Sequence, residues 1–289
     1  MSPSRRIDVE PVELDLDPKV KPTRVTRVKP VPIHMQEAVD KCVEDLVKQG
    51  VLKGPHTESR EWLHSAKFVM KGDGVNVRMT VDMVAMNKAI KRSPVPFISA
   101  NEMRRSIKSE SRFFASLDLT SGYWQIPLTD ESTKLCSVLL PQGVFDFLVT
   151  IQGMSNSGDH FNRITYEIFK GLLGYNKIAL KEIDDIMSQA ATVDEIINNL
   201  DQLFTRCGEN NGTVKRSKIQ IGREIPFVGF QVSAIDGGCP QIRMDPKKME
   251  AMKQIPRPMN VKELRSFMGT AVQFSSWSTG YQHSAKLLN

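Results

Sequence analysis

The pattern that most limits the possible folds is an irregular succession of short strand-like runs and amphipathic helices. The strand-like runs are apolar and span residues 66–70, 75–81, 113–119, 137–140, 145–150, 178–187 and 225–232. Glycine-containing turn signals at 72–74, 141–143 and 236–238 separate several of them. Because strands and helices do not alternate strictly, we predict a mixed α+β sheet and not a doubly wound parallel one.

Six helices are expected between these runs. Apolar residues recur at helical spacing from Ala38 to Val47 and stop before Gly50, a residue typical of the position after a helix. Another helix is expected through residues 161–172, and a short one opens at Pro246. Capping-box pairs predict three more, at Ser99 with Glu102, Thr192 with Glu195, and Asn260 with Glu263.

The first 30 residues lack any helical period. Positive charge is concentrated there without an intervening acid, at Lys19, Lys21, Arg24, Arg27 and Lys29. We expect an extended, mobile basic arm. A solvated tail is the simpler interpretation, and contact with nucleic-acid phosphates is the alternative.

Composition excludes several classes of protein. A hydrophobic share of 40% with a net charge of +6 is enough to bury a core, so the chain is not wholly disordered. No apolar run approaches the roughly 20 residues that cross a bilayer, and we expect no membrane partner. The four cysteines lie far apart and no two histidines are three or four residues apart. We therefore expect neither a zinc site nor a disulfide framework, but reduced thiols in an intracellular protein.

Two acid-bearing apolar runs carry the candidate chemistry. Asp118 lies next to the end of the run 113–119, and Asp184 with Asp185 interrupts the run 178–187. A charge held in such a run needs a cation or hydrogen-bond partners. If the two strands lie side by side, their carboxylates could converge on shared divalent cations, as phosphoryl transfer by two metals requires. From spacing alone, a hairpin with both aspartates at its tip is the stronger interpretation.

Around these acids the chain resembles the reverse transcriptases of gypsy-like LTR retrotransposons and, more distantly, those of retroviruses. The resemblance extends from about Val31 to the C-terminus. It depends on short motifs in the family's order, at residues 49–52, 69–74, 78–87, 94–96, 116–126, 152–161, 183–186, 227–230, 245–248 and 264–269. Each motif alone is weak, and the ordered set is specific.

The resemblance implies a right-hand polymerase, an α+β fold with fingers, palm and a partial thumb. The ranges that it implies are an extended basic arm at 1–30, fingers at 31–93 and 126–151, palm at 94–125 and 152–234, and thumb-like helices at 235–289.

The resemblance also implies roles for individual residues. Asp118, Asp184 and Asp185 would hold two Mg²⁺ ions, with Mn²⁺ as an alternative, and the Leu119 carbonyl could add a ligand. The groups near the triphosphate and the incoming nucleotide would be Lys71, Arg78, Gln152, the backbone of Gly153, and Lys218 beside the leaving pyrophosphate. The primer terminus would be supported by Phe227, Val228, Gly229 and Phe230, and phosphates would meet Lys247, Lys248, Lys253, Arg257, Lys262 and Arg265 on the thumb-like helices.

Tyr123, five residues after Asp118, falls at the position that discriminates sugars in the family. A ring packed under the nucleotide sugar leaves no room for a 2′-hydroxyl. Without the resemblance, a plain core tyrosine is the preferred interpretation.

The sequence also departs from the family pattern. Glu182 stands where the usual Y-x-D-D motif has an aromatic residue, and an acid there could repel phosphate. Val84 replaces a basic residue, and residues 154–159 are less apolar than expected.

The expected function is RNA-directed DNA synthesis from dNTPs on an RNA or DNA template with a primer. We find no protease or RNase H signature in the chain, so RNase H and integrase modules of the same polyprotein are expected partners. The expected location is intracellular, either cytoplasmic in retroelement particles or nuclear. The alternatives are a catalytically silent nucleic-acid-binding remnant and a metal-dependent nuclease, which would leave Tyr123, Gln152 and residues 227–230 unused.

Overall fold

The computed structural model describes residues 6–95, 100–119, 122–272, 275 and 280–286. The chain divides into two compact units, and each is described by itself. Unit 1 holds Met1–Pro96, Leu119–Lys170 and Phe204–Val214, and unit 2 holds Phe97–Asp118, Gly171–Leu203 and Lys215–Asn289. The predicted cap Ser99, and Pro96, Thr120 and Ser121 of the motifs, lie outside the described residues. In the described ranges, no helix has the length and apolar character needed to cross a bilayer.

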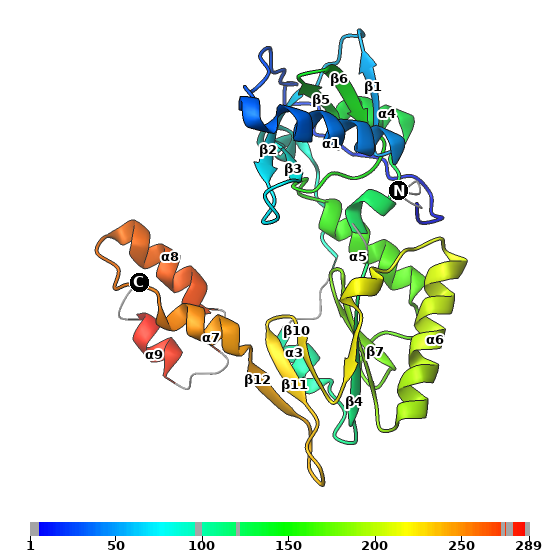
Figure 1. The fold of residues 1–289 in the computed structure, drawn as a ribbon, viewed down its shortest axis with the longest axis vertical. Coiled ribbons are helices and arrows are strands. Elements are labelled where there is room, and N and C mark those ends of the chain that lie inside the picture. The colour runs from blue at the N-terminus through cyan, green and yellow to red at the C-terminus, as the bar shows by residue number, and fades with distance from the viewer. Residues whose placement is uncertain (1–5, 96–99, 120–121, 273–274, 276–279, 287–289) are drawn as a thin grey trace. The chain divides into compact units, whose positions relative to one another are not determined.

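Unit 1 is built on a five-stranded sheet of order β1-β6-β5-β2-β3 (Figure 1). All neighbouring strands are antiparallel except β2 and β5. The strands are β1 (Leu52–His56), β2 (His64–Met70), β3 (Val77–Val81), β5 (Ser137–Leu140) and β6 (Gly143–Phe147). Helix α1 (Gln36–Lys48) buries Val39 against Val77 of β3, so the predicted amphipathic helix covers this sheet.

Within the described residues, unit 1 contains five further helical segments and the end of α6 (Val193–Glu209), which begins in unit 2. The five are η1 (Ile33–Met35), α2 (Val84–Ala89), η2 (Gly122–Gln125), α4 (Asp130–Leu135) and α5 (Ser157–Ile168). Gly122 opens η2 against the ring of Phe161 in α5, and a Cβ on Gly122 would come within 2.6 Å of that ring. Only glycine therefore allows this approach of η2 to α5.

The expected mobility of the N-terminal arm is wrong for the described part of it. Ile7, Val12 and Leu14 are buried, and the backbone NH of Val12 donates to Pro127 at 2.8 Å. Further along, the NH of Asp17 donates to Ala89 at 2.7 Å, and the segment 23–25 exchanges two backbone bonds with Leu63. Buried apolar residues and irregular backbone hydrogen bonds hold the arm against unit 1 as an extended strap. The sequence did not reveal this attachment, because the arm has neither helical nor strand periodicity.

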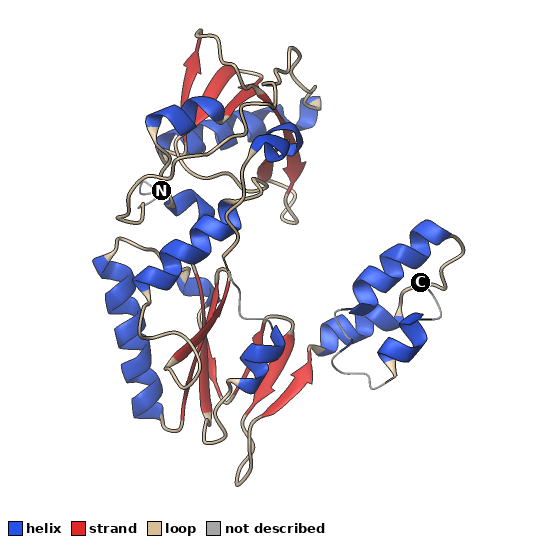
Figure 2. Cartoon of the chain, turned by 180° about the vertical axis from the view of Figure 1, so that it is seen from behind, coloured by secondary structure: helices blue, strands red, loops and turns tan. Residues whose placement is uncertain are grey.

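Unit 2 contains two sheets, visible as separate groups of strands in Figure 2. The first is antiparallel throughout, with order β7-β8-β4-β9, and consists of β4 (Phe113–Asp118), β7 (Ala179–Glu182), β8 (Asp185–Ala190) and β9 (Gln220–Gly222). The second consists of β10 (Glu224–Phe227), β11 (Phe230–Ser233) and β12 (Gln241–Met244). The helical segments are α3 (Ala100–Arg105), the first part of α6 (Val193–Glu209), η3 (Arg216–Lys218), α7 (Pro246–Lys253), α8 (Val261–Ala271) and α9 (Tyr281–Lys286).

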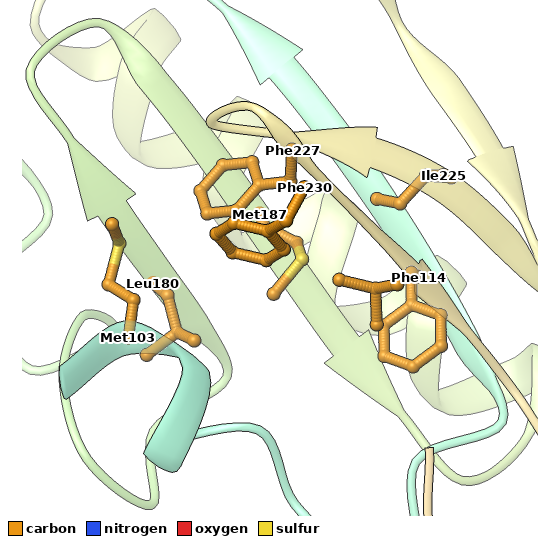
Figure 3. Close-up of a cluster of buried hydrophobic side chains, with 8 residues drawn as sticks. Met103, Phe114, Leu180, Met187, Ile225, Phe227 and Phe230 are labelled. Carbon is orange, nitrogen blue, oxygen red and sulfur yellow. The ribbon is translucent and has the colours of Figure 1, made fainter. Parts of the chain in front are cut away.

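A hydrophobic cluster joins the two sheets of unit 2 (Figure 3). Its buried members are Met103, Phe114, Leu180, Met187, Ile225, Phe227, Phe230 and Val232. Leu180 and Met187 are cross-strand partners, so they lie on one face of the first sheet. The rings of Phe227 and Phe230 meet edge to face with centroids 5.7 Å apart. The cluster therefore fixes the β10–β11 hairpin against that face.

Two predicted runs are hairpins and not single strands. The run 178–187 breaks at Ile183 and Asp184 between β7 and β8, and the run 225–232 breaks at Val228 and Gly229 between β10 and β11. The strand expected at 145–150 begins earlier, at Gly143. The capping boxes at Thr192 and Asn260 form, and each cap accepts a hydrogen bond from the backbone NH of the predicted glutamate.

Candidate active site

Three carboxylates lie in one row across the first sheet of unit 2. Asp118 at the end of β4 is the cross-strand partner of Asp185 in β8, and Asp185 is the partner of Glu182 in β7. Directly opposed residues of antiparallel strands share a face, with Cβ atoms about 5 Å apart. The structure thus brings Asp118 and Asp185 together as predicted, and it adds Glu182 to their row.

Asp184 occupies the turn beside this row. The turn has two residues, Ile183 and Asp184, and Ile183 adopts a left-handed backbone with φ of 53°. A β-branched residue in this region is strained. The predicted hairpin is therefore present, but Asp185 belongs to the strand and only Asp184 to the tip.

The charges in the row are only partly balanced. Burial, together with the negative charges of Asp184 and Asp118, raises the pKa of Asp185 above its ordinary value. Burial and the nearby charge of Asp185 likewise raise the pKa of Glu182. Lys218 Nζ forms an ion pair with Asp118 Oδ2, and this hydrogen bond raises the pKa of Lys218. Lys218 therefore balances part of the negative charge of these carboxylates, which together attract cations.

A cleft of about 380 Å³ opens in front of Asp118 and Asp185. It is lined by Ser116, Leu117, Asp118, Asp185, Lys218, Gln220, Pro226, Phe227, Val228 and Gly229. Asp118 and Asp185, two of the three predicted metal-binding acids, and most of the predicted primer-supporting segment thus face one space. Phe230 is buried in the core behind Phe227.

The β10–β11 turn at this cleft has unusual backbone geometry. Val228 and Gly229 have φ of 47° and 79°, so both central residues of the turn are left-handed. This is the pattern of a type I′ hairpin, which ordinarily takes asparagine and glycine. In the described part of the chain, Ile183 and Val228 are the two β-branched residues with positive φ, and both sit at hairpin tips beside the row of acids. Such strain is characteristic of functional sites.

The predicted nucleotide-binding residues other than Lys218 belong to unit 1, as does Leu119. Tyr123 is half-buried in η2, and its ring lies 5.5 Å from that of Phe161. Lys71 and Arg78 are exposed at the β2–β3 hairpin and make no ion pair among the residues described. Leu119 is buried and bridges to Val214.

Gln152 and Gly153 form an exposed turn that precedes α5 in unit 1. Gly153 has a φ of 101°, and its carbonyl accepts a hydrogen bond from Asn87 Nδ2 at 2.9 Å. Asn87 Oδ1 also accepts from the NH of Ser155 at 2.8 Å. Asn87 therefore shapes the loop, a role that its place in a motif did not reveal.

The family model that describes "Reverse transcriptase (RNA-dependent DNA polymerase)" matches residues 69–232. This match covers more than half of the chain and includes all three aspartates. The chain belongs to the reverse transcriptase family.

Retroelement polyproteins are similar to this reverse transcriptase over most of its length. The Pol polyprotein of transposon opus from Drosophila melanogaster is 27% identical over 90% of the chain and 25% of its own length. The Pol polyprotein of transposon gypsy from the same organism is 26% identical over 92% of the chain and 24% of its own length. The resemblance to gypsy-like elements is confirmed, and the chain spans about a quarter of these relatives.

Solved structures confirm the predicted fold class. A foamy viral protease-reverse transcriptase in complex with double-stranded DNA has a TM-score of 0.83 and 20% identity, and it covers 98% of this chain and 47% of that chain. The complex with an RNA/DNA hybrid has a TM-score of 0.76 and 20% identity, and the match covers 93% of this chain and 34% of that chain. The chain has the α+β right-hand polymerase fold. The ranges predicted for fingers, palm and thumb stay predictions.

Reverse transcriptases depend on divalent metals, and the donors in the row suit such ions in type. Carboxylate oxygens are hard ligands, and the mutual repulsion of Asp118, Asp184 and Asp185 would be relieved by a cation. Among the described residues, no three or more His, Cys, Asp or Glu side chains are arranged as a formed metal site. Instead, the ammonium group of Lys218 forms an ion pair with one carboxylate oxygen of Asp118. The residues fit Mg²⁺ or Mn²⁺ in chemistry and charge, without a preformed cage.

Proposed function

We propose that this chain is an RNA-directed DNA polymerase that extends a primer with dNTPs on an RNA or DNA template. The observation that carries the proposal is the pairing of Asp118 with Asp185 at the floor of a cleft bordered by Lys218 and the Val228–Gly229 turn. Family membership supplies the reaction class. Asp118, Asp184 and Asp185, with the Leu119 carbonyl, would hold two divalent ions.

In the proposed reaction the primer 3′-hydroxyl attacks the α-phosphorus of the dNTP in line. One P–O bond forms, the bond to pyrophosphate breaks, and the hydroxyl proton leaves to solvent. When bound, the two metal ions would activate the hydroxyl and neutralise the leaving phosphates. No covalent intermediate with the protein is required.

The chain's own residues would position the substrates and discriminate between sugars. Lys218 offers a positive charge toward the leaving pyrophosphate, and the planar guanidinium of Arg78 with the ammonium of Lys71 would bind the triphosphate. Gln152 and the Gly153 backbone would border the nucleotide, and Tyr123 would exclude a 2′-hydroxyl. The stiff turn between Phe227 and Phe230 would support the primer end.

A silent nucleic-acid-binding remnant is the second candidate. It is favoured by Glu182, which adds a negative charge to the row of Asp185 and Asp118, and by Val84, which is 65% exposed at the start of α2. Such a remnant would bind template-primer in a salt-sensitive way without extending it.

The relatives suggest partners for this chain. The foamy viral proteins are described in complex with double-stranded DNA or an RNA/DNA hybrid, and we propose that this chain binds similar duplexes. Since the relatives are retrovirus-related Pol polyproteins, we also propose RNase H and integrase modules as partners. The proposed location is intracellular, in cytoplasmic retroelement particles or in the nucleus.

Extension of a DNA primer on an RNA template by purified protein tests the proposal. We expect extension that requires Mg²⁺ or Mn²⁺ and is lost in Asp185→Asn, while template-primer binding persists in that variant. Tight binding by the parent protein without extension would instead support the silent remnant. Shortening of the primer without dNTPs would indicate a nuclease.

A further inference from the structure

Glu182 is an acid at a position where a phosphate-bearing primer is expected. It ends β7 opposite Asp185, so its carboxylate lies on the face that carries Asp118. Its Oε2 atom is buried and has no hydrogen-bond partner within the described ranges. A buried carboxylate oxygen without a partner is costly unless a cation compensates its charge.

Lys248 supplies a nearby positive charge from a different element. It lies in α7, and its charge acts to lower the pKa of Glu182, against the larger effects of burial and of the Asp185 charge, which raise it. The lysine is exposed, but its Nζ lies directly against Gly229, so closely that a Cβ on Gly229 would overlap it. The left-handed backbone favours glycine at this position, whereas the flexible end of the Lys248 side chain can move away from an added Cβ.

The start of α7 is fastened to the same turn. Asp245 caps the helix by accepting from the NH of Lys247 at 2.9 Å, and its own NH donates to the Gly229 carbonyl at 3.4 Å. Met244, the last residue of β12, is the cross-strand partner of Phe230. Lys248 is therefore held at the β10–β11 turn by backbone geometry and not only by its flexible side chain.

We propose that Lys248 compensates the charge of Glu182 and so allows a primer phosphodiester to approach the row of acids. Lys248 is a positioning residue that acts through Glu182. The inference depends on the proposed function, because it concerns how the primer end is accepted. Each nucleotide of the primer brings one negative charge, and an uncompensated carboxylate would repel it.

A double-mutant cycle on template-primer binding tests this pair. Binding is measured in EDTA without dNTPs, at two salt concentrations, for Glu182→Gln, Lys248→Met and the double variant. We expect Lys248→Met to weaken binding about fivefold when Glu182 is present and less than about twofold in the Glu182→Gln background. We also expect Glu182→Gln alone to bind no more weakly than the parent protein.

Lys247→Met is the matched control, since Lys247 is exposed on the same helix and next in sequence. Lys247→Met should change template-primer binding by the same factor in the parent protein and in the Glu182→Gln background. Thermal unfolding confirms that each variant is folded. If Lys248→Met does not fold, the exchange of Glu182→Lys with Lys248→Glu replaces it, and binding should be weaker in Lys248→Glu alone than in the exchanged pair.

Equal loss from Lys248→Met in both backgrounds would overturn the inference and would mean that Lys248 meets phosphate directly. The polymerase proposal has a separate readout. If the parent protein does not extend primers but shows the coupling, the polymerase proposal is rejected and the Glu182–Lys248 inference is retained. If the parent protein extends primers but the two substitutions weaken binding additively, the Glu182–Lys248 inference is rejected and the polymerase proposal is retained.

Discussion

Asp118 and Asp185 are directly opposed on β4 and β8, although 66 positions separate them in the sequence. The pairing gives the two carboxylates a common face and a common neighbour, Lys218, whose ammonium group contacts Asp118. Burial raises the pKa of Asp185, and repulsion by the negative charges of Asp184 and Asp118 raises it further.

Replacing either aspartate should remove catalysis and leave the fold intact. We expect Asp118→Asn and Asp185→Asn each to lower the rate of primer extension by about ten thousandfold or more, as in other sets of residues that act as a unit. Template-primer binding should persist, because amides do not repel phosphate. Steady-state extension assays with a binding measurement check this, and Asp201→Asn on the exposed side of α6 is the control. Extension near the parent rate by either variant would refute the assignment.

Tyr123 should determine the preference for deoxynucleotides. We expect Tyr123→Ala to reduce discrimination against ribonucleotides by about tenfold or more, because removal of the ring opens space for the 2′-hydroxyl. Tyr123→Phe retains the ring and its contact with Phe161, so it should keep the parent preference. The ratio of kcat/KM for dNTP and NTP measures the effect. An unchanged ratio in Tyr123→Ala would mean that Tyr123 is a core residue and does not discriminate between sugars.

The strained turn at Ile183 should lower stability. Asparagine tolerates a left-handed backbone better than a β-branched residue, so Ile183→Asn should raise the free energy of unfolding by about 1 kcal/mol. Denaturant unfolding measures the change, and Ile183→Val, which keeps the β-branch, should not raise it. Lower stability in the asparagine variant would mean that the packing of the Ile183 side chain outweighs the strain.

The buried ion pair of Arg60 and Asp146 should stabilise unit 1. Arg60 donates to both carboxylate oxygens at 3.1 and 2.7 Å, and Ser137 adds a bond at 2.6 Å. Asp146→Asn should therefore cost about 3 kcal/mol of stability at neutral pH, because Arg60 stays buried without its main partner. Glu58→Gln, a change at an exposed partner of the same arginine, should alter stability little.

The same pair sets a pH dependence. Burial on its own would raise the pKa of Asp146, but the bonds from Arg60 and Ser137 outweigh it and hold the pKa below its ordinary value. The stabilisation should be complete above the unfolded-state pKa of about 3.9 and be lost as pH falls through the lower pKa of the folded state. Unfolding curves between neutral and acid pH should show this loss in the parent protein and lack it in Asp146→Asn.

The basic half of the strap should contribute to nucleic-acid affinity. Lys21, Arg24 and Arg27 are exposed, and backbone bonds between the strap and Leu63 fix this stretch on unit 1. Changing all three to glutamine should reduce the slope of log affinity against log salt by about 2 to 3. A triple glutamine variant at Lys41, Lys48 and Lys170, which are also exposed in unit 1, is the control. Equal slopes in the two triple variants would favour the solvated-tail interpretation.

The predictable parts of the fold were those with strong local signals. The capping boxes at Thr192 and Asn260 formed as expected, and the run ending at Asp118 is a strand. Strand β1 was missed because it contains Gly54 and Pro55, which local rules count against a strand. Its pairing with β6 overrides those preferences.

The candidate site was only partly predictable for a similar reason. Asp118 and Asp185 were identified as candidates because charges in apolar runs are conspicuous. The place of Glu182 in their row depends on the two-residue turn at Ile183 and Asp184, which sets the register of β7 on β8. Lys248 was one of several basic residues in the sequence, and only the packing against Gly229 distinguishes it.

The strand order of unit 1 has a consequence for synthesis on the ribosome. β1 and β2 are close in sequence, but β6 and β5 separate them in the sheet. In a nascent chain that has emerged as far as β3, β2 and β3 can pair, but the partner strand of β1 has not yet been made. The sheet can be completed only after Phe147 has appeared. Until then β1 and the edge of β2 that later pairs with β5 expose backbone groups that other chains can pair with. Slow or interrupted translation between Val81 and Phe147 should therefore favour aggregation over folding.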